Sequence, residues 1–314
     1  MNRYWIFIVF YVIALGTNLF AQSEIIKFEN ISNRNGLSQG SVVSIAQDEK
    51  GFMWFGTYDG LNRYDGYTFK VYRNDVNDQK SLSNNFVRTL LVDQSGTLWA
   101  GTQGGGINRY DKDSDNFIRY NYNPNDKSSL SHDNIFQIYQ DSQGSIWIAT
   151  WGGGLDRIIP NSQNDFDKKL VFEHYLNNPD KKLSLANNRV SSLYEDNSGR
   201  LWIGTRNGVN VFDLHKNSFI KTYLNNSKDS NSLSDNNVTK ITGDRFGNIW
   251  ISTWGSGLNL LNPETEKFHH FKNIPNNSNS ISYDVIMSLY TDRYGNIWIC
   301  TWGGGLNKLV LPGD

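Results

Sequence analysis

The stretch DSQGSIWIAT at residues 141–150 decides the fold, because five other segments of the chain repeat its pattern. Each segment starts with Asp, has Gly three residues later and a central Trp, and ends in a small residue followed by Thr. The tryptophans recur at intervals of about 48 residues, which is typical of a protein built from repeated structural units. The six segments are DEKGFMWFGT (Trp54), DQSGTLWAGT (Trp99), DSQGSIWIAT (Trp147), DNSGRLWIGT (Trp202), DRFGNIWIST (Trp250) and DRYGNIWICT (Trp298).

Every repeat contains four short runs with strand character. The first run ends at the recurrent Asp, the second carries Trp and Thr, the third follows a Gly-rich step, and the fourth is an outer run such as residues 69–72 or 117–120. The Asp-x-x-Gly spacing predicts a tight turn between the first two runs, because Asp accepts local backbone N–H groups and Gly tolerates positive φ. The predicted turn residues are Asp48, Asp93, Asp141, Asp196, Asp244 and Asp292.

Repeats of this length, with four strands and one Trp, predict an all-β fold: a β-propeller whose tryptophans pack between neighbouring blades. An aromatic content of 14% agrees with strands packed through bulky rings. The last repeat lacks an outer run, whereas residues 25–28, before the first repeat, have the pattern of one. Two forms remain open: a closed six-bladed ring sealed by residues 25–28, or six blades of an incomplete seven-bladed ring.

The beginning of the chain has the layout of a signal peptide. Arg3 precedes an apolar run at residues 4–15, which is too short to span a membrane, and small residues lead to a cleavage site after Ala21. We therefore predict a signal peptide at residues 1–21 and one propeller domain at residues 22–314, located in the periplasm or otherwise outside the cytoplasm, with no membrane span after cleavage. The longest repeat contains an insertion at residues 159–170, predicted to be a surface loop.

Charge and composition exclude several functions. Thirty Lys and Arg nearly balance 31 Asp and Glu, which leaves no net field to attract nucleic acid or an anionic membrane. No His, Cys or Asp cluster has the spacing of a metal site, and the glycines at 104–106 lack the helix and Lys of a nucleotide loop, so no metal or cofactor is expected. Cys300 occupies the position of Gly or another small residue in other repeats, and we predict a buried thiol in a tight slot.

The repeats resemble the two-component regulator propeller repeats of the N-terminal periplasmic sensor region in Bacteroidetes hybrid histidine kinases. The opening GLSQGSVVSIAQDEKGFMWFGTYDGLNRYDGYTFKVY and the phrases LWIGT and WGGGLN carry this resemblance over residues 25–310. It implies a sensor that recognises glycan breakdown products and takes part in signal transduction by phosphorelay. The chain departs from that pattern, because the sequence contains no phosphoacceptor His motif and no ATP-lid glycine motif. We therefore expect a sensor module, or a truncated fragment, and not an enzyme.

Positions that vary between repeats, while staying polar or aromatic, are the better candidates for ligand binding. One set follows the recurrent Thr, where aromatic planes could stack on sugar rings and Arg or Gln could bind hydroxyl or carboxylate groups. A second, basic set lies in the third run. The alternative for both is structural: aromatics that shield glycines and basic groups that pair with turn Asp. The first set is Tyr58, Gln103, Trp151, Arg206, Trp254 and Trp302; the second is Arg63, Arg109 and Arg157, with Lys308 at the same position.

Two other functions remain open. A propeller glycosidase or lyase requires paired carboxylates that depart from the repeat. Glu173 and Glu195 are non-repeating acids, but each lies in an ordinary strand or turn context, so no catalytic residue is predicted. A protein-interaction propeller, with a protein partner or as a homodimer, is the other alternative, because Asn-rich loops such as residues 121–134 could recognise protein as well as an oligosaccharide.

Overall fold

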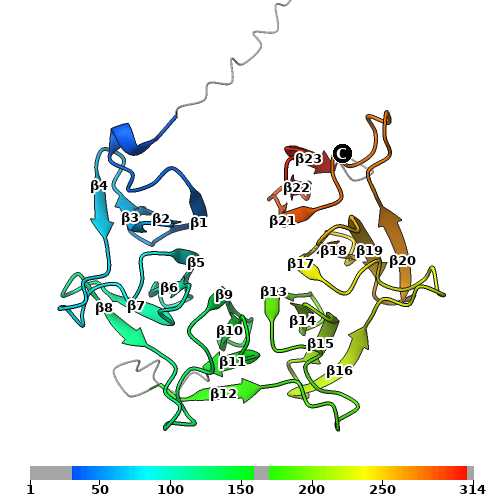
Figure 1. Cartoon of the computed structure of the whole chain (residues 1–314), viewed down its shortest axis with the longest axis horizontal. Coiled ribbons are helices and arrows are strands. Elements are labelled where there is room, and N and C mark those ends of the chain that lie inside the picture. The colour runs from blue at the N-terminus through cyan, green and yellow to red at the C-terminus, as the bar shows by residue number, and fades with distance from the viewer. Residues whose placement is uncertain (1–29, 159–169, 310–314) are drawn as a thin grey trace, which may run out of the picture. The chain divides into compact units, whose positions relative to one another are not determined.

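The computed structural model describes residues 30–158 and 170–309, and its strands belong to one compact unit, Ser32–Asp314. Within these residues, six antiparallel sheets form the six blades of a β-propeller (Figure 1), so the predicted fold is confirmed. Each blade follows the chain from its inner strand outward. The blades are β1–β4 (Val42–Gln47, Met53–Thr57, Gly60–Tyr64, Phe69–Tyr72), β5–β8 (Val87–Val92, Leu98–Thr102, Ile107–Asp111, Asn116–Tyr120), β9–β12 (Ile135–Gln140, Ile146–Thr150, Leu155–Ile158, Phe172–Tyr175), β13–β16 (Val190–Glu195, Arg200–Thr205, Gly208–Asp213, Ser218–Tyr223), β17–β20 (Val238–Gly243, Ile249–Thr253, Leu258–Asn262, Lys267–Phe271) and β21–β23 (Ile286–Thr291, Ile297–Thr301, Leu306–Leu309).

The sixth blade has three strands among the described residues, and the other five have four. A short 3-10 helix, η1 (Asn33–Asn35), precedes β1. The predicted signal peptide, the run at 25–28 and all but the last residue of the insertion at 159–170 lie outside the described residues.

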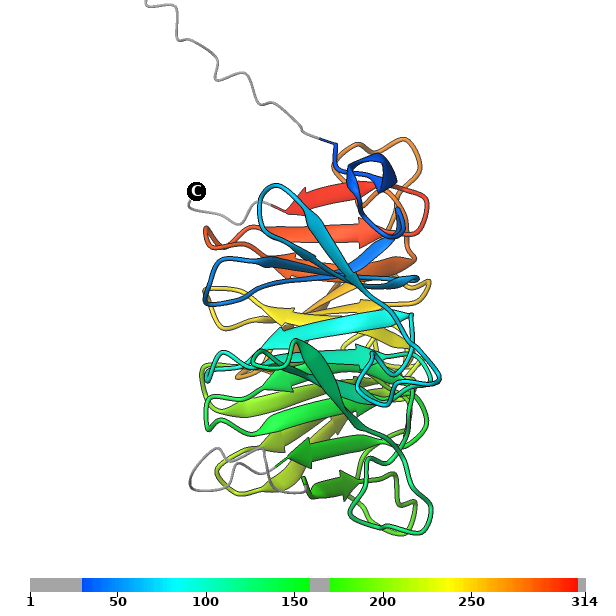
Figure 2. The same ribbon diagram turned by 90° about the vertical axis from the view of Figure 1, so that its left-hand side faces the viewer.

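The inner strands of successive blades lie side by side around a common axis. β1 packs on β5, and the same contact continues through β9, β13, β17 and β21 (Figure 1). The strands of each blade run between two ends, which Figure 2 shows from the side. The Asp-x-x-Gly turns lie at one end, and the loops after the recurrent Thr lie at the other.

Five of the six recurrent tryptophans are buried in the core between blades, as predicted, whereas Trp298 of the last blade is half-buried. Trp147 of the third blade is fully buried and packs with Leu201, Ile203 and Phe212 of the fourth. Its indole Nε1 donates to Asp141 Oδ2 at 2.7 Å, a bond that the sequence did not indicate. The corresponding bond, at 2.7 to 2.9 Å, joins Trp to Asp in every blade. The turn aspartate therefore shapes the turn and anchors the core ring.

The prediction for Cys300 is wrong, because its side chain is exposed. In other blades the small residue faces the first inner-strand residue of the next blade: a Cβ on Gly101 would lie 2.6 Å from Ile135 Cγ2, and one on Gly204 would lie 2.7 Å from Val238 Cγ1. No inner strand covers Cys300 among the described residues. The slot is tight only where a following blade closes it.

The first blade also has a face that no neighbouring blade covers, on the side opposite to the second blade. Val42 and Ile45 of β1 are 40% and 60% exposed, whereas the equivalent Val238 and Ile241 of β17 are 1% exposed. β1 and β21 lie apart on either side of an opening (Figure 1). The described residues therefore form an open arc of six blades, with one uncovered face at each end.

Candidate ligand-binding surface

The loop after each second strand is held in shape by the recurrent threonine. Thr150 Oγ1 donates to the carbonyl oxygen of Gly154 at 2.8 Å, and the N–H of Gly153 donates to the same hydroxyl at 3.1 Å. Gly154 has a φ of 82°, and a Cβ there would lie 2.4 Å from the carbonyl oxygen of Tyr175. Only glycine fits this position. The loop glycines thus have a structural role, and they present the residue after Thr at a defined place.

A second contact fixes the connection that enters each blade. The Ser83 N–H donates to Asn108 Oδ1 at 2.9 Å, and Asn108 Nδ2 donates to Ser83 Oγ at 2.8 Å. The same backbone contact occurs once per blade, which explains the recurrent Leu-Ser signal: Leu enters the core and the next residue bonds the third strand.

The third blade departs from this pattern, since Asp156 replaces Asn. Asp156 is fully buried and accepts from the backbone N–H and hydroxyl of Ser131 at 2.9 and 2.8 Å. His174 Nδ1 lies 2.6 Å from its other oxygen, while His174 Nε2 lies 2.9 Å from the Lys127 carbonyl oxygen. The hydrogen bond to Asp156 raises the pKa of His174 above its ordinary value. His174 is half-buried, and its protonated form pairs with the fully buried carboxylate of Asp156 inside one blade.

The six candidates after Thr, here called the rim residues, all lie at this loop end. Three of them form β-bridges with the residue that precedes the next inner strand: Gln103 with Asn134, Trp151 with Arg189, and Trp254 with Val285. Each such rim residue therefore stands between two blades and close to the axis. Trp151 is half-buried and the other five are exposed.

The aromatic rim residues make specific ring contacts. Trp151 stacks on Phe136, with ring centroids 4.2 Å apart and planes 12° from parallel, and the Arg206 guanidinium lies 5.0 Å from the Trp151 ring. Trp254 and Trp302, 44% and 61% exposed, lie 6.0 Å apart. Exposed, supported aromatic planes next to cations are suited to binding a flat polar ligand.

Sequence reasoning missed a set of residues beside the rim. In every blade the pairing of inner and second strands shifts at the second inner-strand residue, which forms a β-bulge. Bulges re-aim side chains and are common beside functional sites. The available signal was that this position varies in residue type between repeats, directly after a recurrent Val or Ile. The bulge residues are Val43, Arg88, Phe136, Ser191, Thr239 and Met287.

The basic candidates of the third strands lie elsewhere. Arg63, Arg109, Arg157 and Lys308 are each in register with the core Trp of their blade. Arg157 lies 5.0 Å from the Trp147 ring and donates to Glu173 Oε2 at 2.6 Å, and Arg63 lies 5.7 Å from the Trp54 ring. These contacts are made within the chain and away from the rim. As ligand-binding residues the arginines remain a prediction that nothing here supports.

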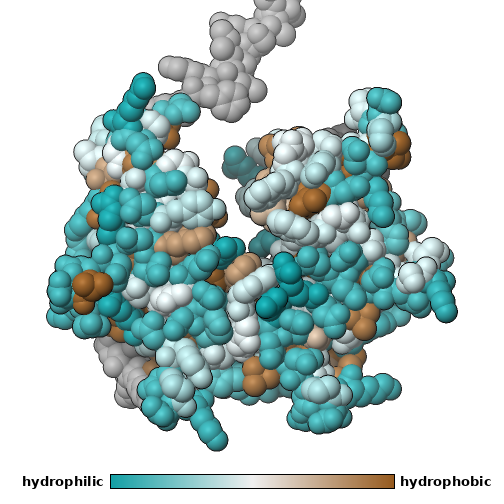
Figure 3. Space-filling view, viewed as in Figure 1, coloured by the Kyte–Doolittle hydropathy of each residue, from teal (hydrophilic) through white to brown (hydrophobic). Residues whose placement is uncertain are grey.

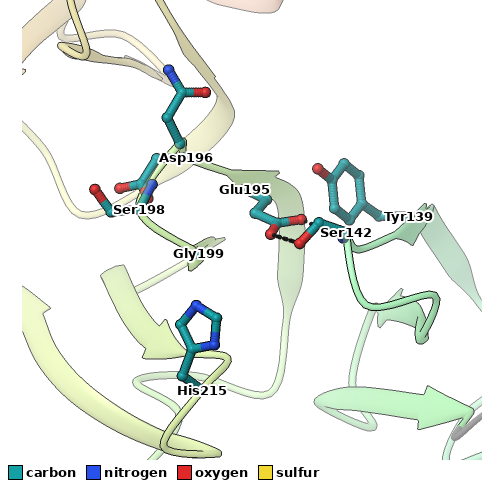
Figure 4. A pocket seen from close by; sticks show the side chains of 8 residues that line it. Tyr139, Ser142, Glu195, Asp196, Ser198, Gly199 and His215 are labelled. Carbon is teal, nitrogen blue, oxygen red and sulfur yellow. Dashed lines mark hydrogen bonds between the residues drawn. The ribbon is translucent and has the colours of Figure 1, made fainter.

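A cavity of about 460 Å³ lies at the opposite, turn end, between the third and fourth blades (Figure 4). Glu195 enters it, but its carboxylate accepts from the Ser142 N–H and hydroxyl at 2.7 and 2.6 Å. Glu173 is engaged by Arg157 on the outer part of the third blade. The two non-repeating acids thus belong to different blades.

The described residues contain no group of three His, Cys, Asp or Glu side chains that could hold a metal ion. In the same part of the chain, no helix is long and apolar enough to cross a membrane.

The fold and the repeated contacts define a propeller of one particular repeat class. Six segments match the family model described as two component regulator propeller, at residues 36–59, 81–104, 129–152, 184–207, 232–255 and 280–303. These segments coincide with the loop, inner strand and Trp strand of each blade. The chain is therefore built from six two-component regulator propeller repeats.

Two relatives place these repeats in sensor proteins. The chain is 27% identical to the extracellular domain of the putative hybrid two component system BT3049 from B. thetaiotaomicron, with a TM-score of 0.66 over 89% of this chain and 41% of that one. It is 43% identical over 82 residues, 26% of its length, to histidine kinase P4 of Formosa agariphila, of which these residues are 6%. The chain thus spans about two-fifths or less of these relatives and is homologous to sensor extracellular domains.

Propeller enzymes also share the fold. A virginiamycin B lyase from Staphylococcus aureus has a TM-score of 0.56 over 87% of this chain and 85% of its own, at 14% identity. At that identity the likeness concerns the fold alone.

Proposed function

We propose that this chain is an extracytoplasmic ligand-sensing propeller of two-component signal transduction, and that its rim residues bind an oligosaccharide. Homology to sensor extracellular domains supports the first part. The second part rests on one observation: paired aromatic side chains, half-buried or exposed, gather at one end of the blades, at positions where the repeat itself imposes no residue type. The signal peptide at residues 1–21 belongs to the same proposal.

Binding to a panel of oligosaccharides, followed by thermal melting and calorimetry, tests the role of the rim. A ligand at 100 times its Kd stabilises the folded state by about 2.7 kcal/mol. Trp254→Ala and Trp302→Ala should each weaken binding roughly tenfold, since loss of about 1.4 kcal/mol of stacking gives that factor. The matched control is Phe246→Ala, because Phe246 is an aromatic residue, 58% exposed, at the turn end of the same blade as Trp254. Equal affinity in all three variants would contradict rim binding.

A protein-interaction role is the second candidate, and the uncovered faces of the first and sixth blades favour it. Val42 and Ile45 on one face and Trp302 and Leu306 on the other are large apolar side chains left exposed. Binding that requires a second protein and no sugar would support this role. Nothing in the arrangement of Glu173 and Glu195 supports a glycosidase or lyase.

A further inference from the structure

The six inner strands are uneven in charge along the axis. Their only basic residues are Arg88 and Lys240, and their only acidic residue is Glu195. Arg88 is the second residue of β5 and Lys240 the third of β17, so both lie toward the rim end, where Val87 pairs with Thr102 and Val238 with Thr253. Glu195 is the last residue of β13, at the turn end, and is engaged by Ser142.

Lys240 reaches from the fifth blade to the third, and no carboxylate of the described residues pairs with it. Its Nζ, on the fifth blade, donates to Gln137 Oε1 of the third blade at 3.1 Å, and this oxygen also accepts the Leu193 N–H at 3.0 Å. Its side chain is half-buried, and removal from water lowers the pKa of Lys240 to about 8. A half-buried ammonium with one neutral, shared acceptor is poorly compensated.

Arg88 is also left without an acidic partner among the described residues. One terminal nitrogen donates to Gln103 Oε1 at 3.1 Å, but Arg88 Nε is buried and has no hydrogen-bond partner. The guanidinium lies 4.1 Å from the centroid of Phe136. Burial lowers the pKa of Arg88 below its ordinary value.

The aromatic rim connects directly to Arg88. The Arg88 guanidinium packs on one bulge residue, Phe136, which stacks at 4.2 Å on the rim residue Trp151. Arg206 lies over the same Trp151 ring. Figure 3 shows an opening between the first and last blades that leads toward the inner strands.

We propose that the rim end of the axis is an oxyanion-binding region, in which Lys240 and Arg88 bind carboxylate or sulfate groups of an acidic sugar. The anion supplies the acceptor that each cation lacks, and the adjoining aromatic planes take the sugar ring. This inference rests on the proposed function and names the ligand class of the same surface.

Calorimetry with the full protein and three trisaccharides tests the inference: an oligogalacturonate, a sulfated trisaccharide and a neutral one. We expect one of the acidic ligands to bind at least tenfold more tightly than the neutral one, and its chemistry identifies the preferred anion. This advantage should decrease with added salt. It should disappear in Lys240→Met and in Arg88→Met, and persist in Lys112→Met, which alters an exposed lysine of the β7–β8 turn.

Thermal melting separates a binding role from a structural one. A lysine held without a counterion costs stability, so Lys240→Met should melt at the same temperature as the wild type or higher while losing the anion preference. A decrease of several degrees would instead mark Lys240 as a structural residue and overturn the inference.

The outcomes distinguish the two proposals. Equal binding of neutral and acidic ligands overturns the oxyanion-binding region and leaves the sensor proposal standing. Binding of inorganic sulfate alone, dependent on Lys240, supports the oxyanion-binding region and contradicts sugar recognition. Binding of no ligand at all overturns both.

Discussion

At the scale of single residues, the bond between turn aspartate and core tryptophan connects local and inter-blade structure. Asp141 accepts from Trp147 Nε1, and its other oxygen accepts the Ser145 and Gln143 N–H groups at 2.8 and 3.0 Å. Asp141→Ala leaves the buried donors of Trp147 and Ser145 unpaired, and we expect a loss of about 3 kcal/mol in the free energy of unfolding, measured by urea denaturation. Asp113→Ala, in an exposed turn, should change it by less than about 0.5 kcal/mol. If both variants lost the same free energy of unfolding, Asp141 would not anchor the core tryptophan.

The pair of Asp156 and His174 predicts a pH effect. The pKa of His174 is raised in the folded state, so the stabilisation is fully present below the ordinary pKa of 6.5 and is lost as pH rises through the folded value. Asp156→Asn restores the residue of the other blades and removes the charge. The wild type should lose this stabilisation as the pH rises above 6.5, and the variant should lack that pH dependence in its melting temperature. NMR titration of the variant should show a lower pKa for His174. An unchanged His174 titration would contradict the pairing.

At the scale of the blade, most elements could be predicted from the sequence because their signals are local. Asp-x-x-Gly locates the first turn, and the alternating runs locate the strands to within about two residues. The Asp–Trp bond and the Ser–Asn contact could not be predicted in detail, because they join groups whose geometry depends on the twist of the finished sheet. The bulges at Arg88 and Phe136 also depend on strand register, which the sequence does not state.

The candidate site was predictable only in part. The rim residues were found because they vary beside an invariant Thr, and the structure gathers them at one end. Arg157 varied in the same way, yet its side chain packs on Trp147 and Glu173. Lys240 and Arg88 could not be predicted from the sequence. A cation that has no acidic partner among the described residues can be recognised only when its neighbours in space are known.

At the scale of the whole arc, the exposure of a residue depends on whether a neighbouring blade exists. Cys300 shows this limit: the repeat correctly identified a slot for a small residue, but the next inner strand does not cover it. Position in the repeat predicts which way a side chain points. Burial requires the partner as well, and for the first and last blades the partner is not part of the repeat pattern.

Because burial requires a neighbouring blade, two isoleucines at equivalent positions of different blades should differ in their contribution to stability. Ile241 packs with Trp202 in the core between the fourth and fifth blades, while Ile45 occupies the same position on the uncovered face of β1. Ile241→Ala should lower the free energy of unfolding by about 2–5 kcal/mol, and Ile45→Ala by less than about 0.5 kcal/mol. Urea denaturation of both variants measures the difference, and thiol labelling of native Cys300 provides an independent check at the other end. Equal losses together with a protected thiol would mean that both faces are covered in solution, either by each other or by a partner. Unequal losses with rapid labelling would establish that the arc stays open.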